Sequence, residues 1–288
     1  NRWCGSSMSA IHYAAGQIAM GAGDAFVAAG VESMTRVPMG GFNPMPNPQL
    51  MADFHGVYMG MGETAEVVAE RYQLSREVQE AFAVESHRKA AAAHEAGKLR
   101  DEIVTVDGVD ADGCIRPDTN LEGLSGLKPA FSATGSVTAG TSSPLTDGAA
   151  ATLVCSAEYA REHNLTPLAV IRSMAINGCD PDVMGLGPIG ATRKALKRAG
   201  LEMGDIDIVE LNEAFASQSI ACINDLGMDL ERINLDGGAI AIGHPLGATG
   251  ARITGKAAAL LKREGKKYAL STQCIGGGQG IATIMEAA

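Results

Sequence analysis

The chain has 288 residues, a length that predicts two domains at about 150 residues each. It carries 23 Lys and Arg against 33 Asp and Glu, and this net charge of −10 argues against nucleic-acid binding, which needs clustered positive charge. No apolar stretch is long enough to cross a bilayer. Because six Cys are too few for a disulfide scaffold, we expect a reducing, cytoplasmic location and look for a reactive thiol.

The first half of the chain predicts helices joined by long polar or glycine-rich connections. Its clearest helix is one that Ser75 can cap, in which Glu77 suits the positive end and which Gly97 can end. In chain order we expect a helix at 6–22, a buried strand at 24–31, a proline-rich loop region at 38–62, a helix at 75–97, polar turns over 101–130 and a helix or strand near 148–156.

The second half alternates predicted strands with predicted helices, which indicates a layered α/β architecture. A glycine-flanked motif, a small-residue helix and a buried strand occur at 4–31 and again at 243–273, which reflects either duplication or chance. The expected elements are a strand at 168–176, a helix at 190–199, a strand at 206–211, a helix at 213–226, an apolar glycine-rich stretch at 233–242, a helix at 247–264 and strands at 267–273 and 280–286.

Cys4 lies in the motif NRWCGSS, directly before a predicted helix. Free N–H groups and partial positive charge at a helix N-terminus favour thiolate over thiol, so we expect a lowered pKa and a nucleophile. Gly5 would let a substrate approach the backbone closely. The alternative is a small buried Cys that only packs, the usual state of a free Cys.

His244 lies in the glycine-rich segment GGAIAIGHPLGATGAR, just before another predicted helix. Pro245 fixes the turn, and a His held between a loop and a helix suits a general base. The alternative is a turn His that caps the helix that follows.

Two further motifs follow predicted strands. Cys274 leads into the glycine-rich segment CIGGGQG, whose backbone N–H groups either hold an oxyanion or only form a tight hairpin. Asn212 begins the segment NEAF after the strand at 206–211, and taken alone it is best interpreted as a helix cap.

We expect no metal site. The other four Cys match no zinc-ligand spacing, and His87 and His94 are interpreted as solvent-facing residues of one helix. The chain contains no P-loop, Rossmann fingerprint or GxSxG elbow.

Two Cys, one His and one Asn lie at glycine-rich corners of the predicted fold. Together they suggest thiol-based acyl chemistry, in which one Cys holds an acyl group and the other moves a proton.

Five motifs together resemble those of the thiolase family: NRWCGSSM, VTAGTSSPLTDGAAA, LNEAFA, GGAIAIGHPLGATGAR and CIGGGQG. They occur in the family's order, and the match runs from residue 1 to residue 288. The resemblance implies thiolysis of 3-ketoacyl-CoA by CoA, or the reverse Claisen condensation, with CoA as a substrate and no prosthetic group. Binding energy from the remote nucleotide would position the thioester at Cys4.

The resemblance also implies a role for each matched residue. Cys4 would be acylated, and His244 would activate it and help to stabilise an enolate oxygen. Cys274 would exchange protons with the second acyl group or the CoA thiol. Asn212 would orient a water in one oxyanion hole, and backbone N–H groups at Cys4 and Gly276 would form the other. The residues that match the family's CoA contacts are Arg116, Ser143 and Phe215.

The implied fold is the thiolase fold, two copies of a five-stranded mixed α/β unit in a layered αβαβα arrangement with an inserted loop domain. Residues 1–33 and 146–166 would belong to the N-terminal domain, 34–145 to a loop domain that covers CoA, and 167–288 to a complete C-terminal domain. Thiolases form dimers or tetramers, which implies a homo-oligomer, and those of β-oxidation often work with a hydratase/dehydrogenase subunit.

Two departures from the family pattern bear on function. Thiolases carry a segment before the nucleophile motif that supplies most strands of the first copy, so we expect either a fragment or a protein that lacks half a domain. Enzymes specialised for acetoacetyl-CoA often have a His where this chain has Gly60. Together with the segment 173–181, this favours a degradative 3-ketoacyl-CoA thiolase of fatty-acid β-oxidation.

Two alternatives stay open at this point. One is an acetoacetyl-CoA thiolase, which relative rates on short and longer ketoacyl chains would distinguish. The other is a truncated, non-catalytic CoA-binding fragment, which would bind CoA without forming a covalent adduct on Cys4.

Overall fold

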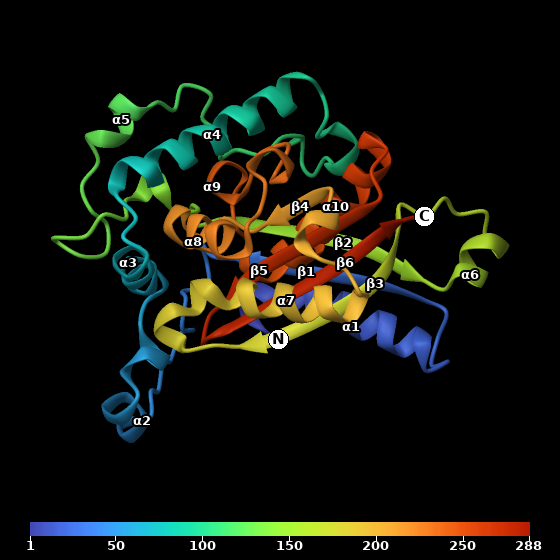
Figure 1. Ribbon diagram of the computed structural model, residues 1–288, viewed down its shortest axis with the longest axis horizontal. Helices are drawn as coiled ribbons and strands as arrows, with labels where there is room; N and C mark the ends of the chain where they lie inside the picture. Colours follow the sequence, from blue (N-terminus) through green and yellow to red (C-terminus); the bar gives the residue numbers. More distant parts are fainter.

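The computed structural model describes residues 1–288, and strands alternate with helices through the second half as predicted (Figure 1). The α-helices are α1 (Ser6–Ala19), α2 (Pro48–Asp53), α3 (Met61–Arg71), α4 (Arg76–Glu95), α5 (Leu121–Ser125), α6 (Ala157–Glu162), α7 (Gly187–Ala199), α8 (Ala216–Leu226), α9 (Ala239–Ile242) and α10 (Leu246–Glu264). The strands are β1 (Ala25–Ser33), β2 (Asp147–Cys155), β3 (Ala169–Gly178), β4 (Ile208–Leu211), β5 (Tyr268–Ile275) and β6 (Gln279–Ala287). The 3₁₀ helices are η1 (Trp3–Gly5), η2 (His55–Tyr58), η3 (Arg100–Glu102), η4 (Ala139–Thr141), η5 (Pro181–Leu186), η6 (Met203–Asp205) and η7 (Leu230–Arg232).

The last four strands form one sheet in the order β3-β6-β5-β4, in which only the β4–β5 pair is parallel. Helices α7 and α8 cover one face, where Leu196 and Ile223 join Leu270 and Ile284 in a buried cluster. Helix α10 covers the other face with residues such as Leu260. Burial of these apolar side chains is the main contribution that holds the helices on the sheet.

Strands β1 and β2 form a second, antiparallel sheet that is paired along its whole length. Its inner face packs on α1 and α10, where Ile11, Ala28 and Ala251 share a buried cluster. Helices α1 and α10 also contact the larger sheet through Met8 and Ile253. The two helices that follow the repeated glycine motifs therefore contact each other and lie between the two sheets.

The sheets have two and four strands, whereas the resemblance implied five in each unit. A single parallel bridge joins Val209 to Ile233 beside β4, at the edge where a fifth strand would pair. The outer face of the smaller sheet is open, since Val27 and Val31 are 71% and 74% exposed. Residues 1–288 thus form four layers of the expected five, because the outer face of the smaller sheet stays uncovered.

A long insertion separates the two strands of the smaller sheet. It leaves β1 after Ser33 and returns at Asp147, and these two residues are paired. In Figure 1 its helices α4 and α5 cross the top of the molecule, while α2 projects at the lower left. The paired strand ends anchor both ends of the insertion, which is mostly helical or irregular.

Helix α3 begins inside the segment predicted as loop. The Glu63 carboxylate accepts a hydrogen bond from the Gly60 N–H at 2.7 Å, which stabilises the first turn. Ala65 and Val68 then bury one face of the helix. The prediction of a loop up to residue 62 is wrong there, because Pro and Gly in the preceding loop masked a helical apolar pattern.

Helix α4 confirms its sequence signals. Ser75 Oγ accepts from the Val78 N–H at 3.4 Å, and Gly97 just past the helix has a φ of +70°. His94 is exposed as expected, but the prediction for His87 is wrong, since that side chain is buried. It faces a neighbouring segment of the insertion, where its Nδ1 accepts from the Arg116 N–H.

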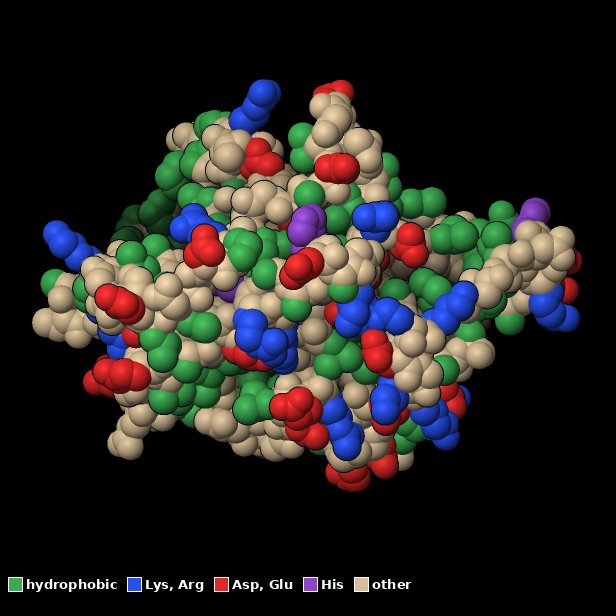
Figure 2. Space-filling view, turned by 90° about the horizontal axis from the view of Figure 1, so that it is seen from above, with side chains coloured by type: hydrophobic (Ala, Val, Ile, Leu, Met, Phe, Trp, Pro, Cys, Tyr) green, Lys and Arg blue, Asp and Glu red, His purple; other side chains and the backbone are tan.

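Three global properties limit the kinds of site that the surface offers. Lys and Arg side chains are interspersed with Asp and Glu side chains over the face seen in Figure 2. None of the helices combines the length and the apolar character that a membrane crossing needs. No three His, Cys, Asp or Glu side chains gather as a candidate metal site, and all six cysteines are free.

Candidate active site

Four junctions between elements bring the predicted catalytic residues to one region. Cys4 lies in η1 ahead of α1, Asn212 directly follows β4, His244 lies between α9 and α10, and Cys274 lies near the end of β5. Strands β4 and β5 are parallel neighbours, so their C-terminal ends meet at one edge of the sheet. All four side chains are at most 8% exposed.

The Cys4 thiol is held against the end of β5. The Gln273 side-chain amide donates to the Cys4 carbonyl, and Gly5 packs so closely on Ile275 that any Cβ would collide. The Gly276 backbone N–H points to the Cys4 sulfur, which favours the thiolate. Burial outweighs this and raises the pKa of Cys4 to about 11. The expectation of a lowered pKa is therefore wrong, and the thiol needs a base.

His244 is a neutral imidazole in this environment. Burial lowers its pKa to about 3, and the positive charge of Arg252 acts in the same direction. Its Nδ1 lies 2.6 Å from Thr249 Oγ1, and its backbone N–H donates to Thr146 Oγ1 at 3.3 Å. These contacts fix the ring. In the tautomer in which Nδ1 carries the proton and donates it to Thr249 Oγ1, Nε2 is the nitrogen that can accept a proton.

Asn212 lies beside His244 rather than at a helix cap. Its Nδ2 is 3.4 Å from His244 Nε2, and its own N–H donates to the Thr272 carbonyl at 3.0 Å. Helix α8 begins only at Ala216 with Phe215 as its N-cap residue, so the capping interpretation is wrong. Asn212 Oδ1 is buried without a hydrogen-bond partner, which leaves an acceptor in the site.

Cys274 lies on the apolar side of the site. It is fully buried and packs in a cluster with Val137, Met184 and Phe215. Burial raises the pKa of Cys274 well above its ordinary value, and negative charge on Cys4 adds to this effect. The two thiols are therefore close enough for the charge of one to affect the ionisation of the other. The glycines after Cys274 also form the tight β5–β6 hairpin, in which two of them have positive φ.

Two of the three residues predicted to contact CoA lie together. Ser143 N–H donates to the Ala214 carbonyl at 3.0 Å, directly beside Phe215. Phe215 meets the Phe131 ring edge to face, with centroids 5.9 Å apart. Arg116 is exposed and belongs to another part of the insertion, next to α4.

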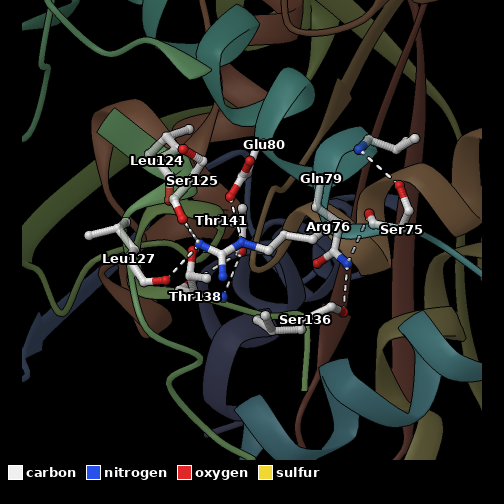
Figure 3. A network of polar contacts seen from close by, with 12 residues as sticks. Ser75, Arg76, Gln79, Glu80, Leu124, Ser125, Leu127, Ser136, Thr138 and Thr141 are labelled. Carbon is white, nitrogen blue, oxygen red and sulfur yellow. Dashed lines mark hydrogen bonds and ion pairs between the residues drawn. The ribbon is translucent and has the colours of Figure 1, made fainter. Parts of the chain in front are cut away.

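The segment that leads to Ser143 is fixed by the first turns of α4 (Figure 3). Arg76 donates from Nη2 to three carbonyl groups between residues 124 and 127 and pairs with Glu80 at 2.6 Å. Gln79 Nε2 donates to Ser136 Oγ at 2.9 Å. These bonds attach the small-residue segment to a rigid helix.

The sequence interpretation did not single out three supporting residues: Thr146, Thr249 and Gln273. Thr249 belongs to the glycine-rich motif around His244, five residues after it, and lies in the first turn of α10. Gln273 precedes Cys274, but its contact with the Cys4 carbonyl joins residues far apart in the chain. Only the fold could reveal that contact.

Comparison with known proteins identifies the family. The family model described as "Thiolase, N-terminal domain" matches residues 1–158, and "Thiolase, C-terminal domain" matches residues 165–287. The chain belongs to the thiolase family. Its α/β fold, with one mixed and one antiparallel sheet, accordingly is the thiolase fold, as the sequence motifs predicted.

Several relatives show how far this thiolase resembles known members. A 3-ketoacyl-CoA thiolase of Marinomonas is 52% identical over 299 residues, which cover 99% of this chain and 76% of the relative. One of Cronobacter sakazakii is 51% identical, with 99% and 77% covered. The solved structure of human mitochondrial 3-ketoacyl-CoA thiolase in complex with CoA matches with a TM-score of 0.91 and 39% identity, and covers all of this chain and 77% of the human one.

Proposed function

We propose that this thiolase cleaves 3-ketoacyl-CoA with CoA, giving acetyl-CoA and a shortened acyl-CoA in fatty-acid β-oxidation. The observation that carries the proposal is the pair of buried thiols, Cys4 and Cys274, at the end of β5. Asn212 and the neutral His244 lie together at the end of the neighbouring strand β4. Relatives that share about half of its residues are named 3-ketoacyl-CoA thiolase, which supports this substrate class.

The first half-reaction forms an acyl-enzyme. His244 Nε2 takes the proton of the Cys4 thiol as the sulfur attacks the 3-keto carbon. The bond between the 2- and 3-carbons breaks, and its electron pair stays on the acetyl-CoA enolate. The Cys274 thiol protonates the enolate carbon, so acetyl-CoA leaves and Cys274 remains as a thiolate. Burial raises the pKa of both thiols, so each one stays protonated until the step in which it transfers its proton.

The second half-reaction returns the enzyme to its starting state. The Cys274 thiolate takes the proton of the incoming CoA thiol, and the CoA sulfur attacks the acyl group on Cys4. Cys4 leaves as a thiolate and regains its proton from His244. The product is the shortened acyl-CoA, and no redox step is needed.

Charge that develops on oxygen needs two sets of donors. The backbone N–H groups of Cys4 and Gly276 would stabilise the oxyanion on the acyl carbon. A water oriented by Asn212, together with His244, would stabilise the enolate oxygen. The unpartnered Asn212 Oδ1 and its nearby Nδ2 support a water at that point. Residues proposed to contact CoA are Arg116, Ser143 and Phe215.

The same proposal extends to organisation and partners. Residues 1–33 and 146–166 would form the N-terminal domain and 167–288 the C-terminal domain, and residues 34–145 would cover CoA. We infer a cytoplasmic homodimer or homotetramer that can work with a hydratase/dehydrogenase subunit and uses CoA only as substrate, without a prosthetic group.

Thiolysis of a medium-chain 3-ketoacyl-CoA by this chain, with Cys4→Ser and Cys274→Ser as matched variants, tests the function. We expect activity that both substitutions abolish. Intact mass should show an acyl adduct on the unchanged chain and none on Cys4→Ser. A folded chain that binds CoA but forms neither product nor adduct would contradict the proposal.

A further inference from the structure

The Glu213 carboxylate is a buried junction between four segments. Its Oε2 accepts from Ser86 Oγ at 2.6 Å and from the Ile240 N–H at 3.2 Å. Its Oε1 accepts from Asn234 Nδ2 at 2.7 Å. These donors belong to α4, to the start of α9 and to the segment beside β4, while Glu213 itself directly follows Asn212. Because a buried carboxylate is costly without such donors, the junction is rigid only when all of them are present.

Asn234 extends this junction to the backbone of the catalytic segment. Its Oδ1 accepts from the Leu211 N–H at 3.0 Å, and its Nδ2 donates to the Leu211 carbonyl at 2.9 Å. Asn234 itself has a φ of +45°, a conformation that Asn tolerates better than most residues. The residues on both sides of Asn212 are therefore held by side chains, one by Asn234 and the other by Ser86.

Ser86 connects the insertion to the segment that leads to His244. Its Oγ also accepts from the Gly238 N–H at 3.2 Å, so one hydroxyl joins Glu213 to the backbone before α9. One turn away, Lys89 Nζ donates to the Ile233 carbonyl at 2.9 Å. The adjacent His87 holds the Arg116 backbone, on the side proposed to contact CoA. One turn of α4 thus contacts both the catalytic segments and the Arg116 segment.

We propose that Ser86 and Glu213 are positioning residues, which couple α4 of the insertion to the placement of Asn212 and His244. The Ser86 hydroxyl donates to the Glu213 carboxylate, and this carboxylate accepts from the Ile240 N–H. The position of the backbone at Ile240 in turn determines the position of His244, which follows in the same segment. The inference rests on the proposed function for its catalytic consequence. Its structural part, the restraint on residues 238–243, stands on the hydrogen bonds alone.

The test is Ser86→Ala, with Ser86→Thr as the conservative variant that keeps the hydroxyl. We expect Ser86→Ala to lower kcat for thiolysis about tenfold with KM for CoA within about twofold, because misplaced catalytic groups slow chemistry more than binding. The Gly238 and Ile240 amides should exchange with deuterium about tenfold faster. The Gly238 N–H loses its acceptor, Ser86 Oγ, and the Ile240 N–H donates to a Glu213 carboxylate that Ser86 no longer fixes in place. Ser86→Thr should restore most of kcat and of the protection.

Ser75→Ala is the matched control, since it removes the N-cap of the same helix away from the junction. It should lower the melting temperature but leave kcat and both amides unchanged. An equal loss of kcat in Ser75→Ala, or unchanged exchange in Ser86→Ala, would overturn the proposal. So would faster exchange with unchanged kcat, which would leave Ser86 structural only. If the unchanged chain performs no thiolysis, the proposed function fails, and the exchange result alone decides whether the junction exists.

Discussion

The protonation of the Cys4–His244 pair is set by burial, not by the helix that follows Cys4. With a pKa of about 11 the thiol is neutral, and with a pKa of about 3 the imidazole is neutral as well. In the proposed mechanism, the neutral thiol and the neutral imidazole are the reactive forms for general-base attack. Both stay the dominant forms over the whole range between these two values.

A flat pH profile follows for the first chemical step. The rate constant for acylation of Cys4 by 3-ketoacyl-CoA should change less than about twofold between pH 7.5 and pH 5.5. An imidazole with the ordinary pKa would be only about one tenth neutral at pH 5.5 and would lose about tenfold in rate. Rapid quenching followed by intact mass measures this rate, and circular dichroism confirms that the chain stays folded. An inflection near pH 6.5 would show that His244 titrates normally.

At the residue scale, motifs predicted positions better than they predicted chemistry. They singled out Asn212 and His244, which the structure places side by side. They gave the wrong direction for the pKa of Cys4, because the following helix is visible in the local sequence whereas burial is not. That burial depends on residues such as Gln273 and Ile275, at the far end of the chain.

At the element scale, the contact between α4 and the loop before α9 depends on a glycine. Gly237 has a φ of +83°, and a Cβ there would lie 2.6 Å from the Ala90 Cβ. Gly237→Ala should therefore destabilise the chain by about 3 kcal/mol, by the sum of left-handed strain and overpacking. Urea unfolding with the linear extrapolation measures this change.

The matched control for this substitution is Gly200→Ala. Gly200 also has a left-handed backbone, with a φ of +69°, but nothing lies within 4 Å of its added Cβ. The cost there should be about 1 kcal/mol, from backbone strain alone. An equal loss of stability at both glycines would show that close packing of α4 against the loop at Gly237 adds nothing to the cost.

Element boundaries show where sequence patterns lose information. The four strands of the second half were predicted, because apolar residues alternate with turn signals. Helix α3 was not, because Gly60 and Gly62 interrupt the pattern that Ala65 and Val68 continue. The segment near Ile233 makes only one bridge to β4, a detail of backbone approach that composition does not encode.

At the scale of the whole molecule, the layered arrangement buries polar groups between the sheets. His12 on α1 lies there, with Nε2 at 2.8 Å from Thr283 Oγ1 on β6. Burial lowers the pKa of His12 to about 4, and the positive charge of Arg2 adds to this. The motifs predicted the layered fold, but not which polar side chains would lie inside it, because that depends on how α1 and β6 pack.

The two buried histidines should therefore each make the fold less stable in mild acid. The folded pKa values of His12 and His244 lie below the ordinary value of 6.5, so the unfolded chain binds these protons first as pH falls. The contribution of these two histidines to stability is complete above pH 6.5 and is lost below it, by about 2 kcal/mol for each of them at pH 5. Replacing His12 removes its share of this loss.

His12→Gln tests this linkage, because an amide can still bond to Thr283 but does not titrate. Urea unfolding at pH 7 and pH 5 should show a loss of stability about 2 kcal/mol smaller in His12→Gln than in the unchanged chain. His94→Asn on α4 is the control, and it should leave the loss unchanged, since this side chain lies exposed on the helix surface. An identical loss in His12→Gln and the unchanged chain would mean that His12 is protonated inside the fold.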